Sequence, residues 1–105
     1  MAAYVVHENP NPRTNAAVPF LLDVQSEVLA MLGTRVVVPL YRREAAGVQP
    51  LARLTPVVQF LGQSLVVMVP ELAGIPLREL GSVAGDLAAA RGEILQAIDL
   101  LLTGF

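Results

Sequence analysis

The first three-quarters of the chain consists of short apolar runs separated by turn-forming residues. Runs rich in valine, leucine and aromatic residues predict β-strands. A proline has no N–H for a ladder, so Pro19 in one of these runs indicates a strand start or an edge, and Pro39 in another indicates an edge or a bulge. The predicted strands span residues 4–6, 18–24, 35–41, 56–60 and 64–69, with a short extended piece at 75–77.

The segments between these strands carry signals of their own. Asn9-Pro10-Asn11-Pro12 has strong turn chemistry, and residues 61–63 fit a hairpin turn that contains glycine. Residues 26–32 predict one or two short helical turns, and residues 42–54 predict a long loop.

The last quarter changes to helical spacing. Ser82 fits the N-cap, Asp86 suits the positive end of the helix dipole, and Gly104 fits the C-terminal stop. A run of strands followed by one long helix predicts an α+β fold. The apolar stripe of this helix, with steps of three and four residues, consists of Val83, Leu87, Ala90, Ile94, Ile98 and Leu101.

Length and composition indicate one domain with surplus apolar surface. A chain of 105 residues has the commonest size for a single domain, so residues 1–105 are expected to form one. Hydrophobic residues make up 54% and charged residues 15%, both on the apolar side of an average soluble domain. Because monomers rarely expose large apolar patches, we expect a buried interface between protomers.

Charge and cysteine content exclude several classes of protein. A net charge of −2 argues against non-specific binding to nucleic acid or to a membrane surface. All seven basic residues are arginine, and the absence of cysteine excludes disulfides and thiolate metal sites. No apolar run approaches the length of about 18 residues that a membrane span needs, and the first residues do not resemble a signal peptide. We therefore expect a cytoplasmic protein.

The residue types that carry catalysis are sparse. His7 is the only histidine, and we interpret it as an ordinary surface residue rather than a general base. The acidic residues are scattered singly, and no phosphate loop, dinucleotide fingerprint or metal-ligand cluster is present. The sequence therefore disfavours an enzyme.

Two polar features remain to be explained. Asp23-Val24-Gln25-Ser26 follows an apolar strand, and we favour side-chain capping of the strand end over a binding role. On the predicted helix, Leu95 and Leu102 flank Asp99 outside the main stripe, and they form either a second packed face or an exposed partner site.

Together these features resemble the CcdB family of toxins from bacterial toxin–antitoxin pairs. The most specific part is residues 20–26, Phe-Leu-Leu-Asp-Val-Gln-Ser, followed by Gly33 and by residues 35–40, Arg-Val-Val-Val-Pro-Leu. The resemblance covers the chain from about residue 18 onward. It continues through Pro56–Val58, Leu65–Met68, Ile75-Pro76, Leu80-Gly81, Ile94, Ala97-Ile98 and Gly104.

The resemblance implies an antiparallel SH3-like toxin barrel or sheet that carries one long C-terminal helix. It also implies a homodimer that binds the A subunit of DNA gyrase and traps the cleaved-DNA complex. A labile CcdA-like antitoxin removes such toxins from gyrase and joins them in autoregulation of transcription. No cofactor takes part, and nucleic acid is contacted only through partners.

The family's gyrase contacts map onto the helix, the tail and one turn of this chain. Thr103 is a departure, since the best-known member has tryptophan there, and Arg91 stands where that member has an acid. The matching positions are Arg91, Leu95, Gln96, Asp99 and Leu102 on the helix, Thr103, Gly104 and Phe105 at the tail, and Val28 and Leu29 in the turn.

The antitoxin contacts of the family map onto the segment from Arg42 to Leu54 and onto one face of the hairpin. An acidic, disordered antitoxin tail could pair with arginines while burying apolar groups. The matching positions are Arg42, Arg43, Arg53, Leu65 and Val67.

Two other functions remain open. The first is an inactive relative that only binds an antitoxin, which the Thr103 departure keeps open. The second is an mRNA endonuclease of the related toxin class. RNA cleavage needs an acid–base pair and cations at the phosphate, which a chain with one histidine and no lysine supplies poorly.

Overall fold

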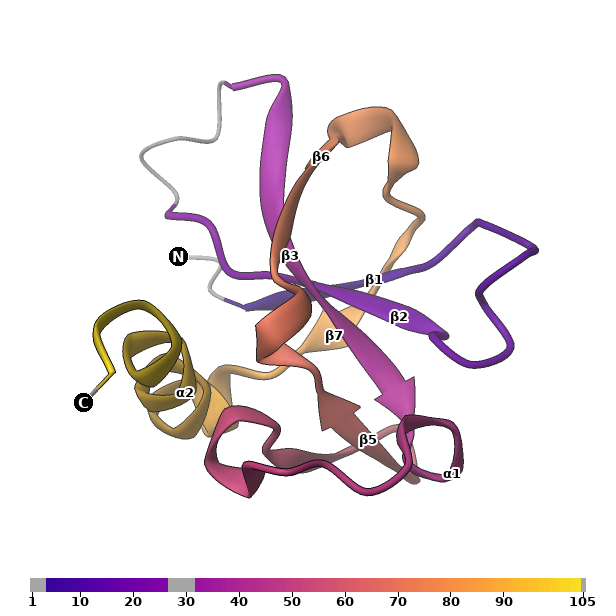
Figure 1. The fold of residues 1–105 in the computed structure, drawn as a ribbon. Helices are drawn as coiled ribbons and strands as arrows, with labels where there is room; N and C mark the ends of the chain where they lie inside the picture. The colour runs from indigo at the N-terminus through magenta and orange to yellow at the C-terminus, as the bar shows by residue number, and fades with distance from the viewer. Residues whose placement is uncertain (1–3, 27–31, 105) are drawn as a thin grey trace.

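The computed structural model describes residues 4–26 and 32–104 and has the predicted α+β organisation. A curled antiparallel sheet forms most of the molecule, and one long helix lies along its side (Figure 1). The strands are β1 (Val5–Glu8), β2 (Phe20–Asp23), β3 (Thr34–Arg42), β4 (Val57–Phe60), β5 (Gln63–Val67), β6 (Ala73–Pro76) and β7 (Val83–Asp86). The helices are α1 (Arg43–Ala46) and α2 (Arg91–Thr103), with short 3-10 turns η2 (Ala52–Leu54), η3 (Val69–Glu71), η4 (Leu77–Glu79) and η5 (Ala88–Ala90).

The sheet runs in the order β4-β5-β3-β2-β1-β7, and β6 pairs with β3 beside β5. On the side away from β2, the long strand β3 changes its partner along its length. Strand β6 pairs with Thr34–Val37, and β5 pairs with Leu40–Arg42. Pro39 lies at this change, where its carbonyl accepts a hydrogen bond from Met68 N at 3.1 Å. Since the N and C=O of a residue in an antiparallel strand face the same neighbour, the missing N–H faces the gap between β6 and β5.

The proline predictions therefore have different outcomes. Pro19 directly precedes β2, so the prediction of a strand start there is confirmed. The prediction of an edge or a bulge at Pro39 is wrong, because β3 is a central strand with a regular register to β2. A central strand tolerates this proline because no ladder bond is required at the point where its partner changes.

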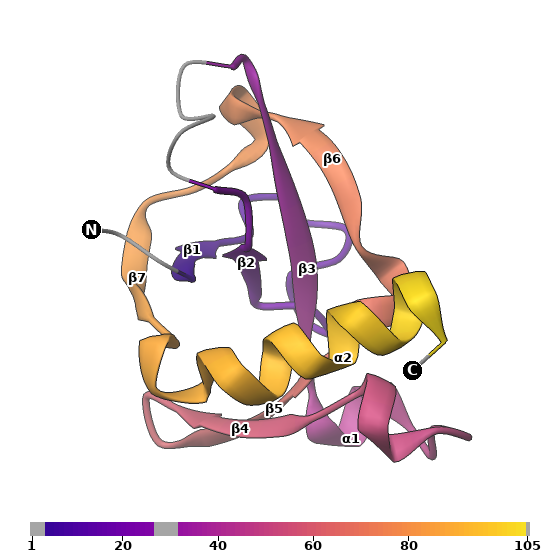
Figure 2. The ribbon, with the colours of Figure 1, turned by 90° about the vertical axis from the view of Figure 1, so that its left-hand side faces the viewer.

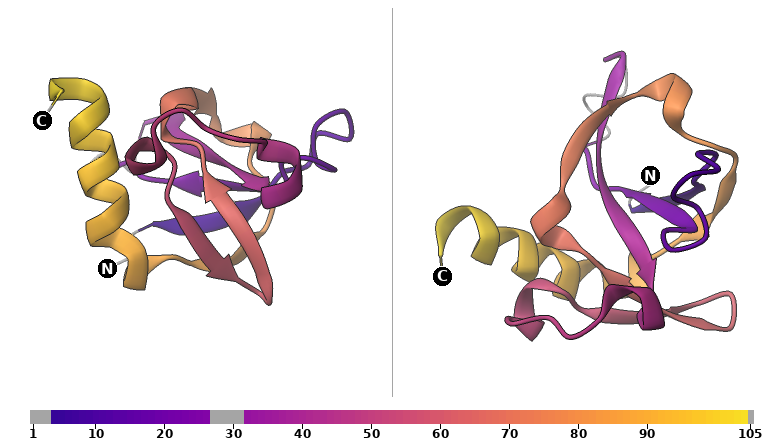
Figure 3. Two further views of the ribbon diagram at one scale, coloured as in Figure 1. Left: turned by 60° about the horizontal axis from the view of Figure 1, so that its bottom comes forward. Right: turned by 45° about the vertical axis from the view of Figure 1, so that its right-hand side comes forward.

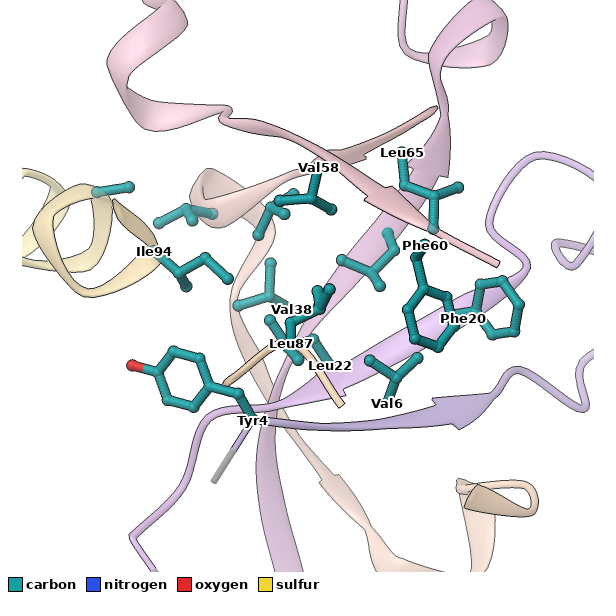
Figure 4. Packing of buried hydrophobic residues seen from close by; sticks show 14 residues of the cluster. Tyr4, Val6, Phe20, Leu22, Val38, Val58, Phe60, Leu65, Leu87 and Ile94 are labelled. Carbon is teal, nitrogen blue, oxygen red and sulfur yellow. The ribbon is translucent and has the colours of Figure 1, made fainter. Parts of the chain in front are cut away.

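One face of the sheet carries the hydrophobic core. Alternate residues of β2 and β3, such as Leu22, Val38 and Leu40, are completely buried, as expected for strands with a period of two. Phe20 and Phe60 meet edge to face, with ring centroids 5.2 Å apart (Figure 4). Ile94 and Ala97 of α2 close the cluster, which also contains Tyr4, Val6, Val58, Leu65, Val67, Val69 and Leu87.

Helix α2 packs against η2 and η3 and runs alongside the β4–β5 hairpin (Figures 2 and 3). It ends as predicted at Gly104, which adopts a left-handed conformation with φ 78° and donates its N–H to the Leu100 carbonyl. Glycine adopts this conformation without the steric cost of a Cβ.

The predicted start of this helix is wrong. Residues 83–86 form strand β7, which pairs with β1, and α2 begins only at Arg91. Ser82 is therefore no N-cap, and Asp86 instead accepts the N–H of Ala88 in the turn before the helix. Gly85 has φ 156°, and a Cβ there would lie 3.0 Å from the Phe60 ring, so this position needs glycine in an extended segment.

The predictions for the remaining segments between the strands have different outcomes. The predicted β-hairpin is confirmed, with β4 paired to β5. The expected long loop at 42–54 is partly wrong, because it contains helix α1 and turn η2. Most of the predicted helical turns at 26–32 lie outside the described residues.

Candidate functional site

A buried polar cluster fixes the end of β2. Arg35 Nε donates to Asp23 Oδ2 at 2.8 Å, and both side chains are almost completely buried. The other carboxylate oxygen accepts the N–H of Gln25, while Gln25 Oε1 accepts the N–H of Val36 at 2.9 Å. These bonds confirm the interpretation of the Asp-Val-Gln-Ser stretch as side-chain capping, because the side chains extend the β2–β3 pairing beyond the last strand residue.

Helix α2 has two contrasting faces. Its inner face buries Ile94 and Ala97 in the core. On a side of the helix away from this core contact, Leu95 is 40% exposed and Leu102 is 70% exposed. We call this side the outer face of α2; its residues are Arg91, Leu95, Gln96, Asp99 and Leu102, and all five are exposed.

The exposed leucines settle the question that the sequence left open about this side of the helix. Among the described residues, neither Leu95 nor Leu102 is buried, so the outer face is not a second packed face of the fold. Two large apolar side chains among charged and amide groups make a surface of the kind that partner proteins cover.

The Thr103 hydroxyl is hydrogen-bonded within the last turn of α2. Thr103 Oγ1 donates to the Asp99 carbonyl at 2.6 Å, a bond to the preceding turn of the helix. Both Thr103 and Gly104 are exposed. The hydroxyl therefore already donates a hydrogen bond within the helix and needs no acceptor from a partner protein.

Tyr4 lies beneath the beginning of α2 and contacts its outer face. The ring is buried in the core cluster next to Ile94, and its hydroxyl points away from the centre of the cluster (Figure 4). The Arg91 guanidinium lies over the ring, with Cζ 5.9 Å from the centroid. Burial raises the pKa of Tyr4; the Arg91 charge lowers it and the Asp99 charge raises it by smaller amounts.

The remaining predicted gyrase contacts fall outside the described residues. They are Val28, Leu29 and Phe105. The structure brings together the seven other predicted contacts, Arg91, Leu95, Gln96, Asp99, Leu102, Thr103 and Gly104, along the exposed side and end of α2.

The predicted antitoxin contacts do not form one surface. Arg43 and Arg53 are exposed, but Arg42 is half-buried and donates to the Ala16 carbonyl and to Gln63 Oε1. Leu65 and Val67 are completely buried in the core, so their prediction as partner contacts is wrong for the side chains of this chain. The reason is the strand period of two, which turns both residues inward with Val58 and Phe60.

A hollow of about 540 Å³, which we call the loop hollow, lies on the sheet face opposite the core. Its floor contains Leu21, Val37 and Pro39, which alternate with the core residues of β2 and β3. Asn9 forms part of the wall and is held there because its amide donates to the Val18 carbonyl and to Thr14 Oγ1.

The rim of the loop hollow is charged. Tyr41 donates its hydroxyl to Glu71 Oε1 at 2.6 Å, which raises the pKa of Tyr41 to about 12, with a further contribution from burial. Arg78 and Glu79 also line it. Sequence reasoning missed this site, although β2 and β3 are apolar at consecutive positions, a pattern that indicates strands covered on both faces.

His7 has a structural role in the described part of the chain. Its Nδ1 lies 3.0 Å from the Gly81 carbonyl oxygen, in reach for an N–H donor. Within residues 4–26 and 32–104, no three side chains of the types that bind metals come together. None of the helices in the described ranges has both the length and the apolar character to cross a membrane.

Comparison with solved structures places the fold among toxins. A structure described as that of an Mtb toxin has a TM-score of 0.69 and 25% sequence identity, over 92% of this chain and 98% of the other. The Mycobacterium tuberculosis toxin MazF-mt6 has a TM-score of 0.70 and 22% identity, over 96% of each chain.

The family comparison agrees with the motif in β2 and β3. The model of the CcdB protein family matches residues 3–104, which includes the buried cluster at Asp23 and the whole of α2. The sheet with one long helix is the architecture expected for that family and is shared with the toxin structures above. The chain therefore belongs to the CcdB family of toxins.

Proposed function

We propose that this protein is a gyrase poison, which binds the A subunit of DNA gyrase and traps the cleaved-DNA complex. The observation that carries the proposal is the exposed outer face of α2 in a member of the CcdB family. This face continues into Thr103 and Gly104, so that the helix end and the tail offer one continuous contact region.

The chemistry of the outer face suits a protein partner. Leu95 and Leu102 supply apolar area that a partner would desolvate. Arg91, Gln96 and Asp99 supply charge and hydrogen-bonding groups around these leucines, which sets specificity more than affinity. Thr103 has no ring, so we propose Phe105 as the aromatic anchor, since aromatic residues dominate many interfaces.

The same proposal includes the partners expected of the family. The protein acts as a homodimer, and a CcdA-like antitoxin with an acidic tail binds near Arg43 and Arg53, which are exposed in α1 and η2. Arg42 contributes less, because its guanidinium already donates within the chain.

A gyrase cleavage assay tests the proposal directly. Purified gyrase, ATP and supercoiled plasmid are incubated with the native protein and with a variant that lacks Gly104 and Phe105. We expect linear DNA with the native protein and little or none with the variant. The variant must show the same circular dichroism spectrum and unfolding midpoint as the native protein, and absence of cleavage with both proteins would contradict the proposal.

A second candidate, cleavage of mRNA, is favoured by the loop hollow and by the fold shared with MazF-mt6. The hollow brings Glu71, Glu79 and Arg78 to one rim, and carboxylates with a cation are the groups that RNA cleavage requires. Against it, one oxygen of the Glu71 carboxylate already accepts a hydrogen bond from Tyr41 within the chain. Discrete products from a long RNA, lost in Glu71→Gln, would favour this candidate.

A third candidate is a relative that only binds an antitoxin. Expression in a sensitive host distinguishes it from a gyrase poison and from an mRNA endonuclease. Normal growth with soluble protein and no cleavage of either nucleic acid would favour it.

A further inference from the structure

Tyr4 has an unusual backbone conformation for its residue type. Its φ is 59°, in the left-handed region that bulky residues rarely adopt. Such a conformation persists only when the surroundings determine it, and it occurs often at functional sites. Here the Tyr4 carbonyl accepts the N–H of Leu87 at 2.9 Å, directly after β7, which fixes the residue at the point where the chain turns toward α2.

The Tyr4 side chain joins the core to the outer face of α2. Tyr4 is only 8% exposed and belongs to the same cluster as Ile94 on the inner face. The ring also contacts Arg91 of the outer face, an exposed residue whose guanidinium lies over it. A buried aromatic ring therefore contacts an arginine that the family resemblance assigns to the gyrase-binding surface.

The contact with Tyr4 bears on the order of the Arg91 side chain. Arg91 is the first residue of α2 and is exposed. An arginine at this point has many accessible rotamers, and ordering it on binding costs entropy. A cation–π contact with a ring fixed by the core restricts those rotamers before the partner arrives.

We propose that Tyr4 is a positioning residue for the partner interface, which holds the Arg91 guanidinium in a fixed place on the outer face of α2. The inference rests on the proposed function, because the partner in question is the A subunit of gyrase. Tyr4 itself remains buried and acts through Arg91 rather than by touching the partner.

Four variants test this role: Tyr4→Phe, Tyr4→Leu, Arg91→Met and the double variant Tyr4→Leu/Arg91→Met. We expect Tyr4→Phe to keep gyrase affinity within about twofold, because phenylalanine retains the ring face. Tyr4→Leu should weaken binding about fivefold, and it should have no further effect once Arg91 is methionine. Equal losses from Tyr4→Leu in both backgrounds would overturn the proposal, because the ring would then act without Arg91.

A second measurement separates this inference from the proposed function. In NMR spectra of the free protein, a ring beneath the guanidinium shifts the Arg91 Hδ and Nε–H resonances upfield. Tyr4→Phe should keep this shift and Tyr4→Leu should abolish it, while the amide spectra of both variants remain those of a folded protein. An Arg91 shift that Tyr4→Leu does not change overturns the positioning role even if gyrase binds. Absence of gyrase binding by the native protein overturns the proposed function and leaves the NMR result to decide on Tyr4.

Discussion

The two polar features that stand out in the sequence have opposite environments in the structure. The cluster at the end of β2 is buried, and Asp23, Gln25 and Arg35 bond to one another and to the backbone. The outer face of α2 is exposed, and its two leucines are 40% and 70% exposed in the described part of the chain. The most recognisable motif of the chain thus maintains the architecture, whereas a less distinctive helix pattern carries the surface proposed for binding.

The largest effect should come from breaking the buried cluster. Asp23→Ala leaves the Arg35 charge buried without a partner, which should lower the free energy of unfolding by about 3–5 kcal/mol in urea titrations. The double variant Asp23→Leu/Arg35→Met removes both charges and should recover most of that loss. A loss below about 1 kcal/mol in Asp23→Ala, or no recovery in the double variant, would show that the pair does not stabilise the strand end as argued.

The next effect concerns binding rather than stability. Leu102→Asp should weaken the affinity for the gyrase A protein by about 2 kcal/mol, or about 30-fold, because it places a charge in the apolar part of the interface. Its unfolding free energy should stay within about 0.5 kcal/mol of the native value, since the side chain is 70% exposed.

Leu61→Asp is the matched control for this variant. Leu61 is 67% exposed in the turn between β4 and β5 and has φ 49°, a region that aspartate tolerates. Calorimetric titration of both variants with the gyrase A protein should find normal affinity for Leu61→Asp. Similar losses in the two variants would place the interface elsewhere.

A smaller loss of stability is expected from the capping glutamine. Gln25→Ala removes the acceptor of the Val36 N–H and should cost about 1 kcal/mol, with gyrase affinity unchanged. Thermal and urea unfolding measure the cost. If gyrase binding fell while stability stayed the same, the β2 end would belong to the binding surface, and the contrast between the two features would fail.

The smallest effect is a pH dependence at the loop hollow. The pKa of Tyr41 is raised from 10.0 to about 12, chiefly because its hydroxyl donates to the Glu71 carboxylate. A raised folded-state pKa means that this contribution to stability is complete below pH 10 and is lost as the pH rises through about 12. The unfolding free energy of the native protein should therefore fall over this range more than that of Tyr41→Phe, and parallel curves would contradict the bond.

The sequence predicted the regular strands well because their signal is local. Strands β3, β4 and β5 follow from runs of valine, leucine and aromatic residues and from the glycine-containing turn, and the end of α2 follows from Gly104. The sequence predicts too early a start for α2, because Val83 and Leu87 have helical spacing by coincidence. What makes residues 83–86 a strand is their pairing with β1, a contact across almost the whole chain that no local pattern contains.

The sequence likewise predicts part of the candidate site and not the rest. The exposed side of α2 could be read from residues outside the apolar stripe, since helical periodicity places them away from the core. The inward direction of Leu65 and Val67 does not follow from the sequence. In a run of consecutive apolar residues, the side that faces the core is unknown until the partner strands are known. The contact between Tyr4 and Arg91 was invisible, because the two residues meet in space but stand near opposite ends of the sequence.

The pairing of β1 with β7 also has a consequence for the order in which the molecule assembles. Val5 pairs with Asp86, so the sheet cannot be completed until more than three-quarters of the chain has been synthesised. Closing so long a loop has an entropic cost and slows folding compared with proteins made of local contacts. Until then the apolar strand β1 has only β2 as a neighbour, and the Tyr4 carbonyl lacks the N–H of Leu87. Because α2 follows β7 in the chain, a nascent chain that still lacks β7 has no surface on α2 to offer.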